Sequence, residues 1–168
     1  VVGCAGGPVV KVNVPIRKVP ADHKKEYYAI KITGLRGGHS GEDIHRGRAN
    51  ANKLLIRVLR ALEENVRFDL SDITGGLKYN AIPRNAEAVI GIEKEAKAAV
   101  DAVIERFSGI FADEYRVNDP GITLEAVPQE AADHILDEAS SRRVLDYIDF
   151  TETGIIRRDQ DYPQFVES

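Results

Sequence analysis

The chain has 168 residues, 43 % of them hydrophobic, which is enough to bury a core in one or two domains. No apolar run reaches the ~18 residues that a membrane span needs, and no basic-then-apolar signal segment opens the chain, so we expect a soluble, cytoplasmic protein with no membrane partner. Its 23 basic residues are interspersed with 27 acidic ones, for a net charge of −4, which argues against nucleic acid as a partner.

Cysteine and methionine usage adds two expectations. The single cysteine, Cys4, excludes an internal disulfide and favours a reducing compartment, where a buried, inert thiol is its simplest role. The chain contains no methionine, even at position 1, so either its start has been processed or it is a piece of a longer protein. The end at "QFVES", in what could be a strand, favours the second interpretation.

The first half of the chain predicts two strands and a helix. Residues 9–17 are predicted as a strand that Pro15 limits to a sheet edge or a connecting arm, because polar residues alternate with Val10, Val12, Val14 and Ile16. A polar linker follows at 18–26. A second alternating strand at 27–33 ends in a glycine-rich turn around His39, and residues 51–62 repeat apolar side chains at helical spacings.

The second half predicts three strands and two further helices. Strands are expected at 66–73 and 86–93, on either side of a turn that contains Asn80. An amphipathic helix follows at 96–111 and a strand at 121–127. A weaker apolar stripe predicts another helix from about Ala131 to Ile148, before an extended tail. From residue 27 onward the order indicates an α+β, ferredoxin-like split βαβ fold, in which two helices cover one face of a four-stranded antiparallel sheet.

The sequence shows no complete catalytic or metal-binding motif. Asp43 and His45 could form a ligand pair, but a helix N-cap is the favoured role for Asp43, and His23 and His134 are predicted as surface residues. The glycine turn lacks the Lys-Ser/Thr of a phosphate loop, and His39 with its neighbour Ser40 lacks a third triad member. The strands also lack the paired aromatic residues on which RNA-binding modules stack bases.

Two segments together resemble a known family. "GLRGGHSGEDIHRGRANANKLL" at 34–55, followed by "GGLKYNAIPRNA" at 75–86, closely resembles the aminoacyl-histidine dipeptidases. These cytosolic Xaa-His dipeptidases are a branch of the di-zinc peptidases that also include carnosinases and aminoacylases. "GCAGG" near the start and "TGIIRRD" with "FVES" near the end are similar to further family segments, so the resemblance extends over essentially the whole chain.

The resemblance implies a domain organisation. Such enzymes have a catalytic domain that binds two divalent metals, zinc or alternatively cobalt or manganese, and an inserted lid of split βαβ fold that forms a homodimer. This chain resembles the lid: an arm at 1–25, the lid and dimerisation domain at 26–128, an extra helix at 129–150 and a returning arm at 151–168. None of the family's metal-ligand motifs is present, so we expect no bound metal and an inactive isolated fragment. Hinges for lid closure are expected near 18–25 and 150–160.

The resemblance also implies roles for two residues. His39 would reach into the partner subunit's active site and donate a hydrogen bond to the scissile carbonyl oxygen; the alternative is that it only packs the turn. Asn80 would contact the dipeptide substrate, or else stabilise its own turn. Several relatives place an arginine about fourteen residues after this asparagine to hold a substrate carboxylate, whereas here Lys94 is the nearest cation in that region.

Two functional hypotheses remain open from the sequence. In the first, the chain is part of a dipeptidase that hydrolyses Xaa-His dipeptides, and His39 is catalytic. In the second, it is a non-catalytic dimerisation or small-molecule-binding module of ferredoxin-like fold, and the glycine turn is structural. The histidine within the glycine turn favours the first hypothesis, because a module that only dimerises does not need an imidazole there.

Overall fold

The computed structural model describes residues 9–162. The elements follow in the order β1 (Lys18–Pro20), β2 (Glu26–Thr33), β3 (Gly38–His39), η1 (Ile44–Arg46), α1 (Ala51–Glu63), β4 (Phe68–Gly75), β5 (Ala81–Ile82), β6 (Ala86–Ile92), η2 (Lys94–Ala96), α2 (Lys97–Glu114), β7 (Thr123–Gln129), β8 (His134–Leu136) and α3 (Glu138–Phe150). Cys4 and the "FVES" segment lie outside the described residues. Within residues 9–162, no helix is both long and apolar enough to cross a membrane.

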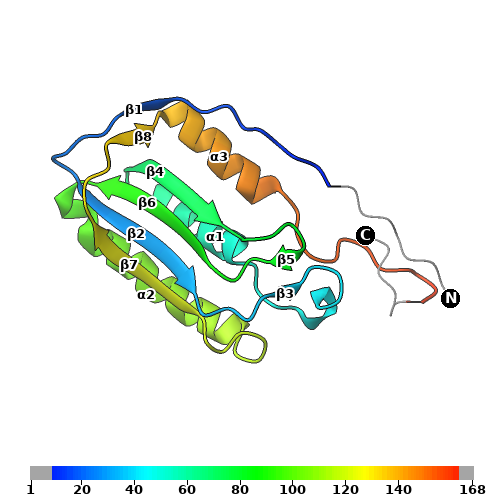
Figure 1. The fold of residues 1–168 in the computed structure, drawn as a ribbon. Helices are drawn as coiled ribbons and strands as arrows, with labels where there is room; N and C mark the ends of the chain where they lie inside the picture. The colour runs from blue at the N-terminus through cyan, green and yellow to red at the C-terminus, as the bar shows by residue number, and fades with distance from the viewer. Residues whose placement is uncertain (1–8, 163–168) are drawn as a thin grey trace.

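The main sheet has the predicted split βαβ topology. Its strand order is β4-β6-β2-β7, and every neighbouring pair is antiparallel. Strand β2 pairs with both β6 and β7, and its residue Ile30 lies opposite Ala88 of β6 and Ala126 of β7. Helices α1 and α2 lie together against one face of this sheet (Figure 1). The α+β fold class predicted from the sequence is therefore confirmed.

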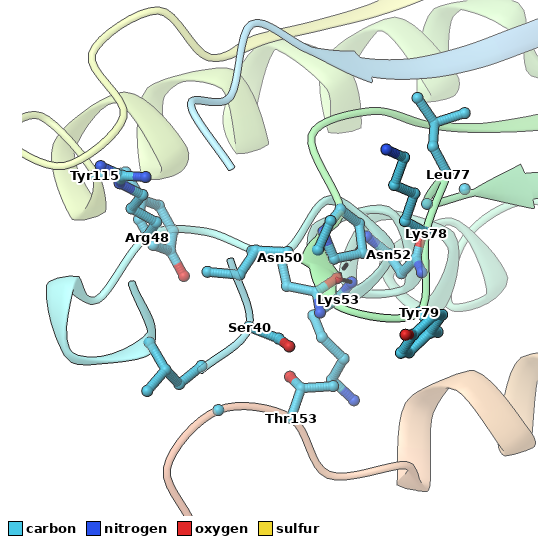
Figure 2. Close-up of a pocket in the computed structure, with 17 residues that line it drawn as sticks. Ser40, Arg48, Asn50, Asn52, Lys53, Leu77, Lys78, Tyr79, Tyr115 and Thr153 are labelled. Carbon is cyan, nitrogen blue, oxygen red and sulfur yellow. Dashed lines mark hydrogen bonds between the residues drawn. The ribbon is translucent and has the colours of Figure 1, made fainter. Parts of the chain in front are cut away.

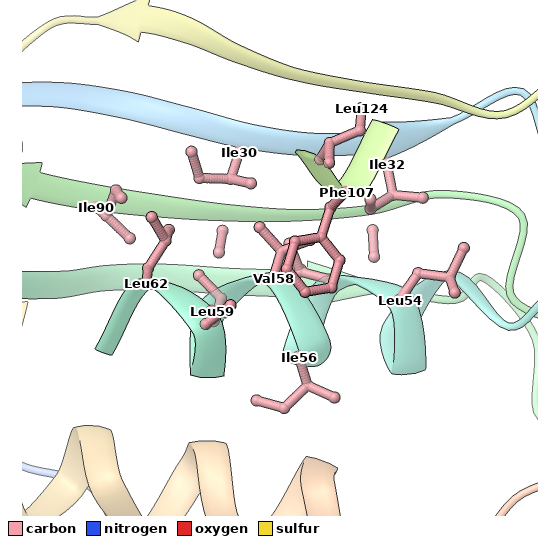
Figure 3. Packing of buried hydrophobic residues seen from close by; sticks show 14 of the residues in the cluster. Ile30, Ile32, Leu54, Ile56, Val58, Leu59, Leu62, Ile90, Phe107 and Leu124 are labelled. Carbon is pink, nitrogen blue, oxygen red and sulfur yellow. The ribbon is translucent and has the colours of Figure 1, made fainter. Parts of the chain in front are cut away.

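The core lies between this sheet and the two helices, as Figure 3 shows for part of the cluster. The apolar stripe of α1 is buried against the inner faces of the strands, with contributions from Leu54, Val58, Leu59 and Leu62. From α2, Phe107 and Phe111 pack edge to face with ring centroids 5.5 Å apart. The helical periodicity that predicted these segments thus corresponds to their buried faces.

Two predicted elements are corrected by the structure. Residues 9–17 do not form a strand; Val10, Val12 and Ile16 are exposed, so their alternation has no sheet to pack against. The strand lies instead at 18–20, inside the predicted linker, where β1 pairs with β8. The helix expected from about Ala131 begins at Glu138, because residues 134–136 form β8 and Asp137 caps the helix by accepting from the Ser140 amide.

Helix α3 is fastened to α1 by two basic side chains. The Lys53 ammonium donates to the main-chain oxygens of Ile148, Asp149 and Thr151, at 3.1, 2.6 and 3.2 Å. A cation at the C-terminus of a helix satisfies carbonyl groups that have no partner within the helix. Arg60 adds ion pairs to Asp146 and Asp149 on the facing side of α3. The additional helix is therefore a fixed part of the domain.

The N-terminal arm is held at the other end of the same helix. The Arg17 amide donates to Ser140 Oγ at 2.8 Å, and the Arg17 guanidinium pairs with Asp137 at 2.6 Å. The predicted hinge at 18–25 thus contains a strand, β1, that is paired with β8, and the residue before this strand, Arg17, is bound to α3 and its cap. Hydrogen bonds from Ser140, and then the one from Arg17, lower the pKa of the Asp137 carboxyl from 3.8 to about 2.

This lowered pKa predicts how acid affects the arm. Because the pKa is lower in the folded state than in the unfolded chain, the ionised carboxylate stabilises the fold above about pH 4, and this contribution is lost as the pH falls towards 2. We expect the stability difference between wild type and Asp137→Asn to be constant near neutral pH and to shrink from about pH 4 downward. Urea unfolding of both chains between about pH 2 and about pH 7 measures this stability difference. A difference that does not change with pH would contradict the lowered pKa of Asp137.

Candidate functional site

The histidine loop, residues 34–49 between β2 and α1, carries the candidate site. Its short strand β3 pairs with β5, and His39 lies opposite Ala81 in this ribbon. One position further, the Ser40 amide donates to the main-chain oxygen of Asn80 at 3.0 Å. The structure therefore brings His39, in β3, close to Asn80, the turn residue directly before β5, although the two are 41 positions apart in the sequence.

Two main-chain hydrogen bonds define which imidazole nitrogen of His39 can donate. The amides of Gly41 and Glu42 both donate to Nδ1, at 3.1 and 3.2 Å. A ring nitrogen that accepts hydrogen bonds carries no hydrogen, so the neutral imidazole must hold its hydrogen on Nε2. The His39 residue is exposed. It consequently presents an N–H donor at the surface of the domain, with the ring held by its own turn.

Asp43 holds the backbone of this turn. Its carboxylate accepts from the His39 amide at 2.9 Å and forms ion pairs with Arg46 at 2.7 Å and Arg48 at 3.7 Å. The hydrogen bond from the His39 amide and then the two arginines lower the pKa of Asp43. Gly38 has a φ of +148°, and a Cβ there would lie 2.7 Å from the Asp43 carboxylate, so the turn requires a glycine.

The predicted N-cap role of Asp43 is corrected by the contacts at the start of α1. Asp43 does not cap the long helix, because α1 begins at Ala51 and Asn50 accepts from the amides of Asn52 and Lys53. The expectation that the helix starts near Asp43 was wrong because a single 3-10 turn, η1, intervenes. Among residues 9–162, no group of three or more His, Cys, Asp or Glu side chains could hold a metal ion. His23 and His134 are exposed, as predicted.

An open pocket of about 690 Å³ lies beside the histidine loop. The histidine loop itself, the start of α1, the turn between β4 and β5, and the segment after α3 contribute to its walls, and Figure 2 shows its polar lining. Residues that line it include Ser40, Arg48, Asn50, Asn52, Lys53 and Tyr79. The turn also carries two apolar residues almost fully in solvent, Leu77 at 94 % and Tyr79 at 84 % exposure. Sequence patterns missed this pocket because its walls come from three distant segments.

Asn80 is half-buried at the base of this turn. Its main-chain oxygen is used by Ser40, whereas its side chain makes no hydrogen bond to any other residue within 9–162. Self-stabilisation of the turn by the Asn80 amide, the alternative considered from the sequence, therefore finds no support in these contacts. The side-chain amide has both a donor and an acceptor available for a ligand.

Lys94 lies far from His39. Strand β6 runs antiparallel to β2, so Ala86 lies next to the end of β2 that leads into the histidine loop, and Ile92, just before Lys94, lies at the opposite end. A cation that does lie near the loop is Arg84, which no sequence motif indicated; it is exposed, and its Nε donates to the Leu35 oxygen at 3.2 Å. Lys94 therefore lies at the opposite end of the sheet from the histidine loop.

The fold and the histidine loop both lie in a part of the chain that is similar to known proteins. The sequence profile of the peptidase dimerisation domain matches residues 30–119, which include the histidine loop and both helices of the main layer. The chain belongs to the peptidase dimerisation domain family. Its similarity to the cytosol non-specific dipeptidase of Escherichia coli is 31 % identity over 169 residues, covering 99 % of this chain and 34 % of that protein.

A solved structure supports the same assignment. The aminoacylhistidine dipeptidase from Vibrio alginolyticus superposes on this peptidase dimerisation domain with a TM-score of 0.82 at 25 % identity, covering 86 % of this chain and 30 % of that one. These comparisons confirm the predicted resemblance and fold. The chain spans about a third of the length of both dipeptidases.

Proposed function

We propose that this chain is the lid and dimerisation domain of a metal-dependent dipeptidase that hydrolyses Xaa-His dipeptides. The family assignment and the similarity to two dipeptidases support a peptidase role. Because the chain spans only about a third of those proteins, the proposal places the catalytic machinery in a separate domain of the same polypeptide. The name of the Escherichia coli relative, a cytosol dipeptidase, supports a cytoplasmic location.

The orientation of the His39 ring is the observation that carries the proposed mechanism. When a peptide carbonyl carbon is attacked, its oxygen gains negative charge, and a donor already placed for that oxygen lowers the barrier. His39 has such a donor on Nε2, since Nδ1 is occupied by the two loop amides. Residues 9–162 contain no group of three or more His, Cys, Asp or Glu side chains that could hold a metal ion. In the proposal, the dipeptide is held in the active site of the partner subunit and His39 reaches it from this domain.

The proposal includes a homodimer formed through this domain. The family is described as a peptidase dimerisation domain, and β7 forms an edge of the sheet with β2 as its only hydrogen-bonded neighbour among the described strands. Edge strands of this kind are usually covered or paired in functional assemblies. In such a dimer, Asn80 would contact the same dipeptide as His39, because its main chain is hydrogen-bonded to Ser40, the residue next to His39.

Metal removal tests this division of labour. Within residues 9–162 no cluster of side chains provides a metal site, so the proposal assigns zinc to the catalytic domain. A chelator is expected to abolish Xaa-His hydrolysis by the full-length protein, and added zinc to restore it, whereas the 168-residue chain should keep its melting temperature throughout. Turnover assays and thermal unfolding measure these effects. Full turnover in the chelator would contradict a metal-dependent dipeptidase.

A further inference from the structure

We propose that Asp119 is a positioning residue for His39: its buried carboxylate holds both ends of the histidine loop and thereby sets where the imidazole lies. This inference rests on the proposed function of His39 and adds a residue that the sequence motifs did not indicate. Asp119 follows α2, in the turn before β7, and lies 80 positions from His39 in the sequence.

The contacts of the carboxylate carry the argument. Asp119 is 1 % exposed, which is unusual for an acidic residue. One carboxylate oxygen accepts from the Arg36 amide and the other from the Ala49 amide, each at 2.7 Å. Arg36 lies three residues before His39, and Ala49 is the last loop residue before the cap of α1. A single side chain therefore closes the loop at its base.

The carboxylate is itself fixed to the core. The Asp119 amide donates to the Tyr115 oxygen at 2.9 Å, and its own carbonyl accepts from Ile122 at 3.2 Å, so the residue is held between the end of α2 and the start of β7. Its neighbour Asn118 donates to the Gly47 oxygen at 3.0 Å, which is a third attachment to the loop. Hydrogen bonds to Asp119 and from Asn118 therefore tie the histidine loop to the segment between α2 and β7.

The two contacts require a carboxylate. Both oxygens of Asp119 act as acceptors, and charge-assisted hydrogen bonds of this type are shorter and stronger than neutral ones. In an Asp119→Asn variant, the NH2 group would face one of the two amide donors, and two donors cannot satisfy each other. One end of the loop would be released while the volume of the side chain is preserved. This makes Asp119→Asn the informative substitution.

The first test is a double-mutant cycle in the full-length enzyme. We expect Asp119→Asn to lower kcat on an Xaa-His dipeptide roughly 10- to 100-fold, since small misplacement of a catalytic group has effects of this size. On a His39→Ala background, the same change should cause little further loss, because a misplaced donor is already absent. Equal losses on both backgrounds, or no loss on either, would overturn the proposal.

Two control variants separate positioning from general damage. Asp113→Asn makes the same chemical change on a side chain that is 84 % exposed, so turnover should stay normal. Ile92→Ala removes a buried side chain at the far end of the sheet and should lower the melting temperature with kcat maintained. A loss of kcat in Ile92→Ala equal to that in Asp119→Asn would assign the effect to stability and overturn the positioning role.

Hydrogen exchange keeps this inference separable from the proposed function. In Asp119→Asn, amide exchange across residues 36–49 should accelerate, while exchange in the central strands should not change. If His39→Ala left turnover unchanged, the catalytic proposal would fail, but faster loop exchange would still support the role of Asp119 in holding the loop. Unchanged loop exchange would overturn that role whatever the kinetics show.

Discussion

If the proposed function is right, replacing His39 by alanine in the full-length protein is expected to lower kcat on an Xaa-His dipeptide by roughly 100- to 1,000-fold, the usual effect of removing one oxyanion donor. The Nε2 hydrogen is free to interact with such an oxygen because the amides of Gly41 and Glu42 occupy Nδ1. A donor used only in the transition state affects kcat more than substrate binding. Steady-state kinetics at saturating metal, with metal content measured in each sample, provide the test.

His45→Ala is the matched control for this prediction. His45 lies in the same loop, on η1, and is also exposed, but no hydrogen bond to its imidazole nitrogens is found among the described residues. Its replacement should leave kcat near the wild-type value. Near-normal turnover of the His39→Ala enzyme would instead favour the second hypothesis, a dimerisation or small-molecule-binding module whose glycine turn is architectural.

The second prediction concerns the start of the histidine loop and compares two glycines. Gly34 has a φ of +79°, and a Cβ there would lie 1.9 Å from the main-chain oxygen of Gly121. Gly34→Ala should therefore lower the free energy of unfolding by roughly 2–4 kcal/mol, from backbone strain together with overpacking. Gly109 lies within α2, and a Cβ there meets nothing within 4 Å. Gly109→Ala should raise stability by about 1 kcal/mol.

Urea unfolding of the three chains under one set of conditions measures both changes. The two substitutions add the same methyl group, so opposite signs can only come from the local backbone and its surroundings. If Gly34→Ala retained wild-type stability, the close approach of the β2 end to the turn before β7 would be incorrect. The attachment of the histidine loop at its base would then also need revision.

Periodicity predicted the elements whose side chains alternate between core and solvent. The stripes of α1 and α2 and the alternation in β2 could be recognised because burial against one layer imposes a period on the sequence. The arm at 9–17 shows the same alternation without burial, and β1 and β8 are too short to show a pattern. Strands β1 and β8 form because they pair with each other across more than 100 positions of the sequence, and a local sequence pattern contains no information about such pairing.

The candidate site was predictable only in part, for a related reason. Glycines around His39 indicated a presented side chain, and the structure places Asn80 beside it. The catalytic and substrate-binding roles, the Xaa-His specificity and the domain boundaries at 25, 128 and 150 stay predictions. Asp119 carried no signal, since an aspartate before a proline and a glycine is typical of an ordinary turn. Its function follows from two amides that the fold brings to it.

The segments before β1 and after α3 are both held to the helices of this domain, one by α3 and the other by α1. On one side Arg143 donates to the Pro15 oxygen, and on the other Lys53 holds the Thr151 oxygen. In Figure 1 the blue segment before β1 and the orange-red segment after α3 run to the same end of the molecule. In the proposed full-length protein, both connections to the catalytic domain would therefore leave from the end of this domain where the histidine loop lies beside the segment after α3.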